Sequence, residues 1–504
     1  MARADDKTSG GEAWRFRLRT EIQQILPMKS YKTESQSTPK TEVKPDTLVL
    51  DTHTLKDLEI FTSETGGKSL LQFCNLSRTE GATKVLRRRM EHPWSSGERI
   101  LATQKSLLFI TQQREVFTRL PEYVTNRVHY YTNDILPIVT QNNVVEFSLG
   151  ALSLRSTHNR HYFRIRLGVQ VTCTLIRVLR EFVDQTELES PVGELGPLIE
   201  EMKDLLKRPR LAAIPDYEIG SWAWKILRLD QVFRLHEKVA TVRLLQLIYE
   251  IDALVSMADV TEKYNFVLPC IEEGPLQVHA EGLVHPFVQN AVANPVELDE
   301  EHRVLFLTGP NMAGKTTYIR AFATALYMAH LGMGVPARSF HFVPAQRLFS
   351  SISLSDDLRS GVSYFRAEAL RVKAVAQAVA EGYRVVALMD EPFKGTNVKD
   401  ALDASLAILT RFAAQKDCLF MFSSHLIELR EELTAMNRVD CCCFSAEEGE
   451  GRLRFDYLLR PGVSSQRLGM RVLREEGVFD LLDKAQKKNE VSLESSETID
   501  SPAV

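Results

Sequence analysis

The stretch LTGPNMAGKTTYIR, residues 307–320, decides the class of fold to which this chain belongs. It fits the phosphate-loop frame G-x-x-x-x-G-K-T. The four fixed positions of that frame are Gly309, Gly314, Lys315 and Thr316. An apolar run precedes the loop at 304–307, and a helical pattern follows it at 318–330. This order of strand, loop and helix predicts a nucleotide-binding loop in an α/β domain.

The residue types of this loop suit the phosphates of a nucleotide. Its glycines let backbone N–H groups close around the phosphates, while Lys315 can reach the terminal ones and the Thr316 hydroxyl can ligate Mg²⁺. The alternative is a glycine turn with a chance lysine, but the flanking strand and helix argue against it. We therefore expect ATP or GTP binding together with Mg²⁺.

Composition describes an ordinary water-soluble chain. Its 504 residues have room for roughly two to four domains. There are 62 Lys and Arg against 66 Asp and Glu, a net charge of −4, so any nucleic-acid-binding surface must be a local patch. No secretory signal and no apolar stretch of about 18 residues is present. We expect a cytoplasmic protein without a membrane partner, nucleoid-associated if bacterial.

The cysteines favour neither a disulfide framework nor a metal site. There are seven, an odd number, and no pair has C-x-x-C spacing. The run Cys441-Cys442-Cys443 lies in an apolar stretch of strand character. Buried thiols are the preferred interpretation of that run.

Hydrophobic periodicity divides the chain into four segments. Residues 1–46 and 484–504 are polar and predict disordered or weakly structured tails. Apolar residues recur at helical spacing through 47–265, whereas 266–483 alternates short β-type runs with helical stretches. The predicted fold is multidomain, with an all-α lever or core domain followed by an α/β P-loop domain.

Two features refine this picture. The stretch 221–264 contains neither Gly nor Pro and predicts one helix of about 40 residues, roughly 60 Å long, which would serve as a lever or strut. In the second half, four apolar runs predict strands of a parallel sheet. These runs are 304–307, 385–389, 418–422 and 439–444.

An acidic pair ends the second of these strands. Hydrolysis of a phosphoanhydride needs one carboxylate to hold Mg²⁺ and a second group to orient the attacking water. Asp390 fits the first role and Glu391 the second. A plain turn with two acidic residues is the alternative, although a phosphate loop about 75 residues earlier makes it the weaker one.

Two further motifs are weak when taken alone. His425 follows the strand at 418–422 and could sense a terminal phosphate, although a histidine that caps a turn is the alternative. The turn SGVSYF, 360–365, could open a helix whose N-terminal amides, together with the Ser363 hydroxyl, hold an anion.

The order of these motifs resembles that of an ABC-type ATPase and, more narrowly, the MutS family of DNA mismatch repair ATPases. Three stretches carry the resemblance: TGPNMAGKTT (308–317), DDLRSGVSYFRAE (356–368) and LMDEPFKGTN (388–397). It extends upstream to GLVHPFVQNAVANPVEL (282–298) and to LDTHTLKDLEIF (50–61), which is similar to the start of the family's lever domain.

The resemblance implies roles for single residues. It implies catalysis by Glu391 and His425, and Mg²⁺ binding by Thr316 and Asp390. Ser363 would reach the nucleotide of a facing subunit, which implies a homodimer. The implied ATP-binding residues are Gly309, Pro310, Asn311, Met312, Ala313, Gly314, Lys315, Thr316, Thr317 and Ser363.

The chain also departs from the family pattern. Ala313 and Thr316 replace Gly and Ser, while Pro392 and Lys394 replace an apolar residue and Arg. Only about 46 residues precede the predicted lever, and they contain no Phe-x-Glu, the family's mismatch wedge. The break at 208–220 is too short for the family's DNA clamp. We expect a truncated member without the usual mismatch reader.

One stretch of the predicted lever has a composition that suits DNA. RSTHNRHYFRIR, 155–166, interleaves arginines with Tyr162 and Phe163, which fits a phosphate backbone and exposed bases. The candidate contacts are Arg155, Arg160, Arg164 and Arg166. A solvated helix face or loop is the alternative, and the sequence alone favours it.

We therefore expect an ATP-hydrolysing homodimer that acts on DNA in repair or recombination, with branched or distorted DNA rather than mismatches as a further option. The alternative is a nucleotide-gated clamp or scaffold whose helical arm binds a protein partner. A transporter-type ABC ATPase is disfavoured, because the lever is part of the same chain.

Overall fold

The computed structural model describes residues 46–63, 66–120, 122–141, 143–187, 192–217, 219–220, 222–352, 364–449, 452–464, 466 and 469–486. Nearly all of the two predicted tails lies outside these residues, and so does Ser363. The described chain combines a helical part with an α/β part that contains a largely parallel sheet. Among the described residues, no helix is long and apolar enough to cross a membrane.

Helices dominate the chain up to residue 263, in agreement with the apolar periodicity. Side-chain caps mark several of their starts: the Ser69 and Thr79 hydroxyls accept from backbone N–H groups of the first helical turn. The helices are α2 (Thr52–Asp57), α3 (Leu70–Cys74), α4 (Glu80–Glu91), α5 (Gly97–Gln112), α6 (Arg114–Thr118), α7 (Glu122–Asn133), α8 (Val144–Thr157), α9 (Asn159–Glu187), α10 (Leu195–Leu206), α11 (Pro209–Ala212), α12 (Ala223–Gln231) and α13 (Lys238–Lys263).

The prediction of one unbroken helix over 221–264 is wrong. A π-helical turn, Val232–His236, follows α12, and Glu237 leaves helical geometry with a φ of −116° before α13 begins. The Glu237 carboxylate is buried and accepts a 2.6 Å hydrogen bond from Arg208 Nε. A wide turn of this kind interrupts the hydrogen-bond ladder without Gly or Pro.

A buried charged cluster lies beside this break. Arg234 donates two hydrogen bonds of 2.6 Å to Asp230 and two more to the carbonyls of Leu136 and Pro137. The Tyr131 hydroxyl donates to the same carboxylate at 2.5 Å. Burial, together with the Asp230 charge, holds the pKa of Tyr131 well above its usual value. The hydroxyl therefore stays protonated, and the buried ion pair is fully hydrogen-bonded.

A seven-stranded sheet forms the centre of the α/β part, in the order β1-β7-β8-β9-β5-β10-β13. Its neighbouring strands are parallel except for the pair β10–β13. The strands are β1 (Val49–Leu50), β7 (Arg347–Ser351), β8 (Val385–Asp390), β9 (Cys418–Ser423), β5 (Val304–Thr308), β10 (Val439–Cys443) and β13 (Arg460–Pro461). The four predicted strands are thus confirmed as β5, β8, β9 and β10.

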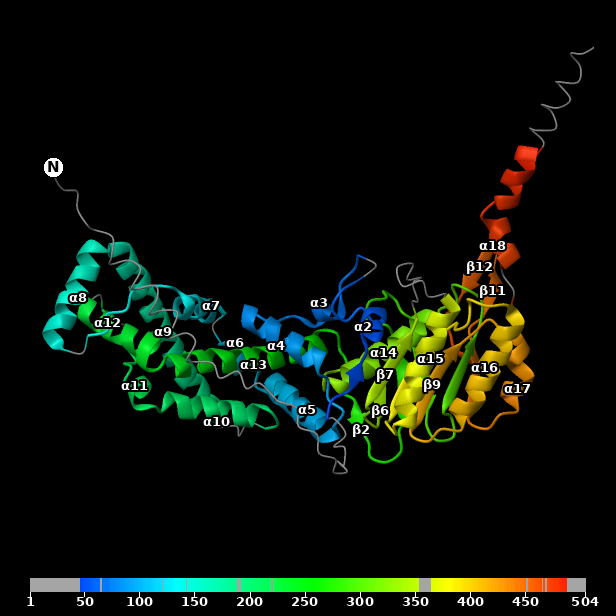
Figure 1. Ribbon diagram of the computed structural model, residues 1–504, viewed down its shortest axis with the longest axis horizontal. Helices are drawn as coiled ribbons and strands as arrows, with labels where there is room; N and C mark the ends of the chain where they lie inside the picture. Colours follow the sequence, from blue (N-terminus) through cyan, green and yellow to red (C-terminus); the bar gives the residue numbers. More distant parts are fainter. Residues whose placement is uncertain are drawn as a thin grey trace, which may run out of the picture. The chain divides into compact units, whose positions relative to one another are not determined.

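Helices cover both faces of this sheet (Figure 1). Leu305 and Leu307 of β5 pack in the cluster that contains α14 (Lys315–His330). Val304 and Phe306, which point to the opposite face, pack in a second cluster. The helices of that second cluster are α15 (Tyr364–Ala380), α16 (Val398–Ala413) and α17 (Arg430–Thr434).

A smaller sheet of four strands adjoins this layer, in the order β2-β6-β3-β4. Its strands are β2 (Cys270–Ile271), β6 (Ser339–Phe342), β3 (Val278–Leu283) and β4 (Asn294–Leu298). The remaining elements are the hairpin β11 (Ala446–Gly449) and β12 (Arg452–Phe455), a 3-10 turn (Ile427–Leu429) and α18 (Gly469–Glu475). Of the cysteine run, Cys442 is buried and its two neighbours are half-buried.

β1, the first strand among the described residues, belongs to the large sheet, although the sequence predicted helix there. β1 pairs in parallel with β7, with Val49 opposite Arg347. The following helix is tied to the same strand, because the Thr54 hydroxyl accepts from the Ser350 N–H at 2.9 Å and Asp57 accepts from the Ser350 hydroxyl at 2.8 Å. The start of the helical part is thus anchored on the sheet.

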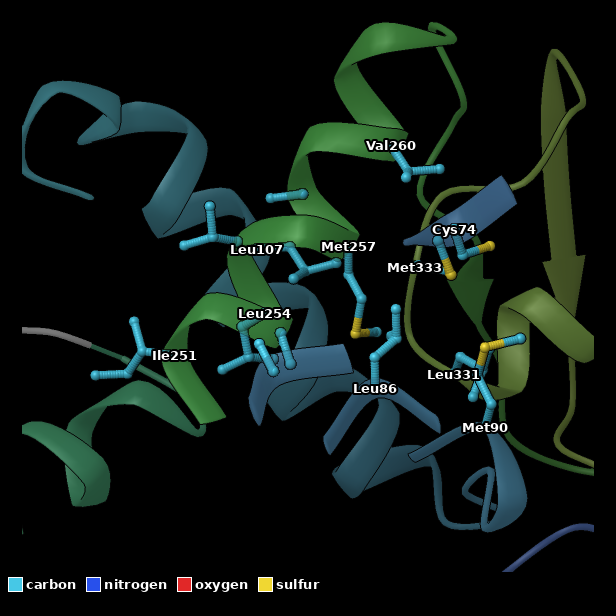
Figure 2. Close-up of a cluster of buried hydrophobic side chains, with 14 of the residues drawn as sticks. Cys74, Leu86, Met90, Leu107, Ile251, Leu254, Met257, Val260, Leu331 and Met333 are labelled. Atoms are coloured by element: carbon cyan, nitrogen blue, oxygen red, sulfur yellow. The ribbon is translucent and has the colours of Figure 1, made fainter. Parts of the chain in front are cut away.

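A second junction joins the two parts through a common core. Leu331 and Met333, which follow α14, pack among Leu86, Met257 and other side chains of α4, α5 and α13 (Figure 2). His330 at the end of α14 donates from Nδ1 to the Trp94 carbonyl at 2.6 Å. The helical part and α14 therefore share one hydrophobic core.

The buried ion pair predicts a large effect of mutation. Asp230→Ala should lower the free energy of unfolding by about 3–5 kcal/mol, because Arg234 would remain buried without its counter-charge. Asp134→Ala is the matched control, since its partner Arg164 is solvent-exposed and such pairs contribute at most about 1 kcal/mol. Urea unfolding followed by circular dichroism measures both. Equal losses in the two variants would contradict the prediction.

Candidate phosphate-binding site

The loop between β5 and α14 has backbone geometry that favours glycine. Gly309 has a φ of 139°, and a Cβ atom there would lie 2.6 Å from the Phe444 carbonyl oxygen. Gly314 has a φ of 104° and directly precedes the first helical residue, Lys315. Between them, Met312 is also left-handed, at 68°. The loop thus turns back over the start of α14, where free N–H groups can bind an anion.

Lys315 lies within this loop rather than in solvent. Its side chain is 4% exposed, and Nζ donates to the carbonyls of Gly309 at 2.8 Å and Pro310 at 3.2 Å. Burial lowers the pKa of Lys315, and the carboxylates of Glu391 and Asp390 offset only part of that effect. The ammonium group is therefore held at the centre of the loop by two carbonyls and, at 3.6 Å, by the Glu391 carboxylate, and an anionic phosphate oxygen could replace the carbonyls.

Hard oxygen donors meet beside the loop. The Thr316 hydroxyl at the start of α14 donates to Asp390 Oδ2 at 2.5 Å, and the Ser423 hydroxyl donates to Oδ1 of the same carboxylate. The three residues come from α14, β8 and β9, whose ends meet at this edge of the sheet. A hydroxyl next to a carboxylate is a donor set that fits Mg²⁺ bound together with phosphates.

Glu391 contacts three basic side chains, of which Lys315 is the most distant, at 3.6 Å from Oε1. Its Oε1 lies 2.5 Å from His425 Nε2, and its Oε2 lies 2.5 Å from Lys394 Nζ. Burial alone would raise the pKa of Glu391, but the hydrogen bonds and charges of His425 and Lys394 outweigh it and lower the pKa to about 2. The carboxylate is therefore ionised at neutral pH. Glu391, whose side chain is 13% exposed, is in direct contact with His425, the other predicted catalytic residue.

A cavity of about 520 Å³ opens beside the loop. Opposite the loop, it is bounded by residues of the β3–β4 connection, among them His285, and by Tyr457. Burial lowers the pKa of His285 to about 4, so its imidazole is neutral at pH 7. The predicted site residues that line the cavity are Pro310, Asn311, Met312, Gly314, Lys315, Thr316, Thr317 and Glu391.

The other predicted residues lie around this cavity or outside the described chain. Ala313 is buried in the loop, and Gly309 lies against the Phe444 backbone. Asp390 and His425 reach the site through their contacts with Thr316 and Glu391. Ser363 lies outside the described residues, so its predicted role stays a prediction.

Sequence reasoning missed Glu368, which binds the backbone of the turn that follows Glu391. Its side chain is 2% exposed and accepts from the backbone N–H groups of Lys394 at 3.0 Å and Gly395 at 3.4 Å. Burial raises the pKa of Glu368 despite these bonds. Glu368 fixes the turn that brings Lys394 to Glu391. The sequence signal that could have identified Glu368 was its position as the last residue of the 356–368 motif.

The four arginines proposed for DNA lie on α8 and α9, and two of them have contacts within the chain. Arg164 pairs with Asp134, and the Arg166 guanidinium lies 5.9 Å from the Phe163 ring centroid. Phe163 is 57% exposed, whereas Tyr162 is only 5% exposed, so of the two rings only that of Phe163 is accessible to a base. Helical spacing turns Tyr162 inward.

The low pKa of Glu391 predicts a pH-dependent contribution to stability. Its folded-state pKa of about 2 lies below the ordinary value of 4.5, so the contribution is present above pH 4.5 and is lost as the pH falls towards 2. The difference in free energy of unfolding between wild type and Glu391→Gln should therefore be larger near pH 6 than near pH 3.5. Urea titrations at both pH values measure it. A difference that grows on acidification would contradict the ion-paired geometry.

The region around this site is similar to known proteins. The family model described as MutS domain V matches residues 305–492. The DNA mismatch repair protein MutS of Ehrlichia ruminantium (strain Welgevonden) is 30% identical over 233 residues, which cover 46% of this chain and 29% of that protein. The chain thus spans less than a third of that relative's length. The region that the family model matches contains the glycine loop, Asp390, Glu391 and His425, so this part of the chain is similar to MutS domain V.

Proposed function

We propose that this protein binds and hydrolyses ATP in an ABC-type domain, residues 266–483, and couples this reaction to DNA through a helical lever, residues 47–265. The observation that carries the proposal is the arrangement of Lys315, Thr316 and Glu391 around one cavity at the start of α14. The match of residues 305–492 to MutS domain V supports ATP and Mg²⁺ as the ligands.

In this proposal each side chain has one task. The loop N–H groups and Lys315 bind the phosphates, while Thr316 and Asp390 hold Mg²⁺, which neutralises phosphate charge when bound. Glu391 is a weak base at its lowered pKa, so it orients the attacking water by hydrogen bonding. Glu391 lines the cavity, so a water there can bond to it, and opening of the His425 contact would let His425 turn to the terminal phosphate.

A homodimer is part of the same proposal. The resemblance of the 356–368 motif to that of the family supports it, because Ser363 would complete the site of the facing subunit. For DNA we propose the exposed arginines of α8 and α9 as phosphate contacts, with repair or recombination proteins as further partners. Branched or distorted DNA is included among the proposed substrates.

A second candidate function has its own supporting observation. The outward face of α8 is apolar: Val145, Leu149 and Leu152 are each more than 60% exposed. The opposite face of the same helix carries Phe147 and Leu154, which are buried. Such an exposed apolar face favours a protein partner for the arm. The alternative is therefore a nucleotide-gated clamp without DNA.

The catalytic proposal predicts the behaviour of Glu391→Gln. This variant should bind ATP as the wild type does. It should hydrolyse ATP at least about 100-fold more slowly, because the group that orients water is lost while Thr316 and Asp390 remain. Steady-state phosphate release and equilibrium binding of a fluorescent ATP analogue measure the two properties. Glu381→Gln, an exposed position at the end of α15, is the control. Unchanged turnover in Glu391→Gln would remove this residue from catalysis.

The DNA proposal predicts a dependence on salt. Phosphate contacts carry no sequence information, so matched and G·T-mismatched duplexes should bind within tenfold of each other, about 1.4 kcal/mol. The double variant Arg155→Ala/Arg160→Ala should reduce the slope of log affinity against log salt by about 2. Arg88→Ala, an exposed position on α4, is the control.

Fluorescence anisotropy at several salt concentrations measures both quantities. An unchanged slope in the double variant would remove these two arginines from the interface. Absence of binding to matched, mismatched, branched and single-stranded DNA at low salt would favour the protein-partner alternative.

A further inference from the structure

Metal-ligating side chains meet on the small four-stranded sheet, outside the nucleotide site. His279 on β3 lies directly opposite Glu297 on β4, and Asp299 follows the end of β4. The ligand atoms of these three residues all lie within 4.8 Å of one another. The group contains one imidazole and two carboxylates, and the site proposed above uses none of them.

Strand alternation explains why these side chains converge. Val278 and Ala280 on β3, and Val296 and Leu298 on β4, are buried in the core. Residues between them point to the opposite, solvent-facing side. His279 and Glu297 are therefore a cross-strand pair whose Cβ atoms lie about 5 Å apart on a rigid hairpin.

Backbone hydrogen bonds hold the Asp299 side chain in position without an ion. Its Oδ1 accepts from the N–H groups of Glu301 and His302, each at 2.8 Å, and lies 3.1 Å from His302 Nδ1. These bonds outweigh burial and lower the pKa of Asp299. The other oxygen, Oδ2, faces His279 Nε2 at 3.9 Å. A carboxylate held by one oxygen and free at the other is the usual outer-shell arrangement of a metal ligand.

The spacing fits an ion better than a direct bond. A separation of 3.9 Å between His279 Nε2 and Asp299 Oδ2 is too long for a hydrogen bond. Among the residues that the structure describes, the side chains of His279 and Glu297 have no hydrogen-bond partner. Tetrahedral Zn²⁺ with bonds of about 2.0–2.2 Å places its ligand atoms about 3.4 Å apart, so small side-chain rotations would complete the site.

We propose that His279, Glu297 and Asp299 bind one Zn²⁺ ion, with water at the fourth position. An imidazole with two carboxylates favours Zn²⁺ over Mg²⁺, which prefers an all-oxygen shell. The ion would tie β3 to the turn that leads from β4 into β5. At its other end the same hairpin pairs Leu283 with Asn294, and both residues line the nucleotide cavity. Zn²⁺ thus braces the hairpin that forms one wall of that cavity.

The test is titration of the full-length, chelator-treated protein with Zn²⁺ alone, without nucleotide, by isothermal titration calorimetry. We expect one saturable site whose affinity falls at least tenfold in His279→Ala and in Glu297→Gln. Zn²⁺ should also raise the melting temperature of the wild type by more than that of either variant at the same Zn²⁺ concentration. Glu297 is exposed, so its substitution leaves the core intact, and circular dichroism of the metal-free variants checks the fold.

Two neighbours in the same cross-strand row are matched controls. His341 lies directly opposite His279, and Cys270 lies opposite His341, so both present alternative ligands. His341→Ala and Cys270→Ser should keep wild-type affinity, and excess Mg²⁺ should not displace Zn²⁺. Loss of affinity in either control with none in His279→Ala, displacement by Mg²⁺, or no saturable binding to the wild type would each overturn the proposal.

Discussion

The structure depends on helix α14, which has one end in the glycine loop at 309–314 and the other in the core of the helical part. Its first residue, Lys315, is enclosed by the loop. Its last residue, His330, donates from Nδ1 to the Trp94 carbonyl and accepts from the Ala345 N–H at Nε2. Burial lowers the pKa of His330 to about 4, so the neutral ring keeps both bonds at neutral pH. A helix of 16 residues, about 24 Å long, is stiff, and a displacement at the loop must move the core around Trp94.

The strands and most helices could be predicted because their signals are local. β5, β8 and β9 are apolar runs that end in polar or glycine residues, as strands buried on both faces do. The break at Glu237 could not be predicted in this way. It depends on Arg208, a residue from another element, and the apolar period of the long helix continues through it. The inward position of Tyr162 likewise follows from the helices against which α9 packs.

In the candidate site too, some features have local sequence signals and others depend on residues that are distant in the sequence. Lys315, Thr316, Asp390 and Glu391 could be proposed together because the carboxyl ends of parallel strands meet at one edge of a sheet. The contact of Lys394 with Glu391 could not be predicted from the sequence. It requires left-handed backbone at Glu391 and Phe393, which their residue types do not favour, and the buried Glu368 supports that turn from a distant helix. His285 enters through the β3–β4 connection, for which only the family resemblance gave a signal.

The place of β1 at the edge of the large sheet has a consequence for synthesis of the chain. Val49 must pair with Arg347, so the strand that leaves the ribosome early finds its partner only after the whole helical part has been made. Contacts so distant in sequence are slow to form, and until they do the β7 edge is open to other strands. A chain in which β7 and β8 have already paired but β1 has not yet docked would therefore expose an adhesive sheet edge, and rapid docking of β1 would shorten that exposure.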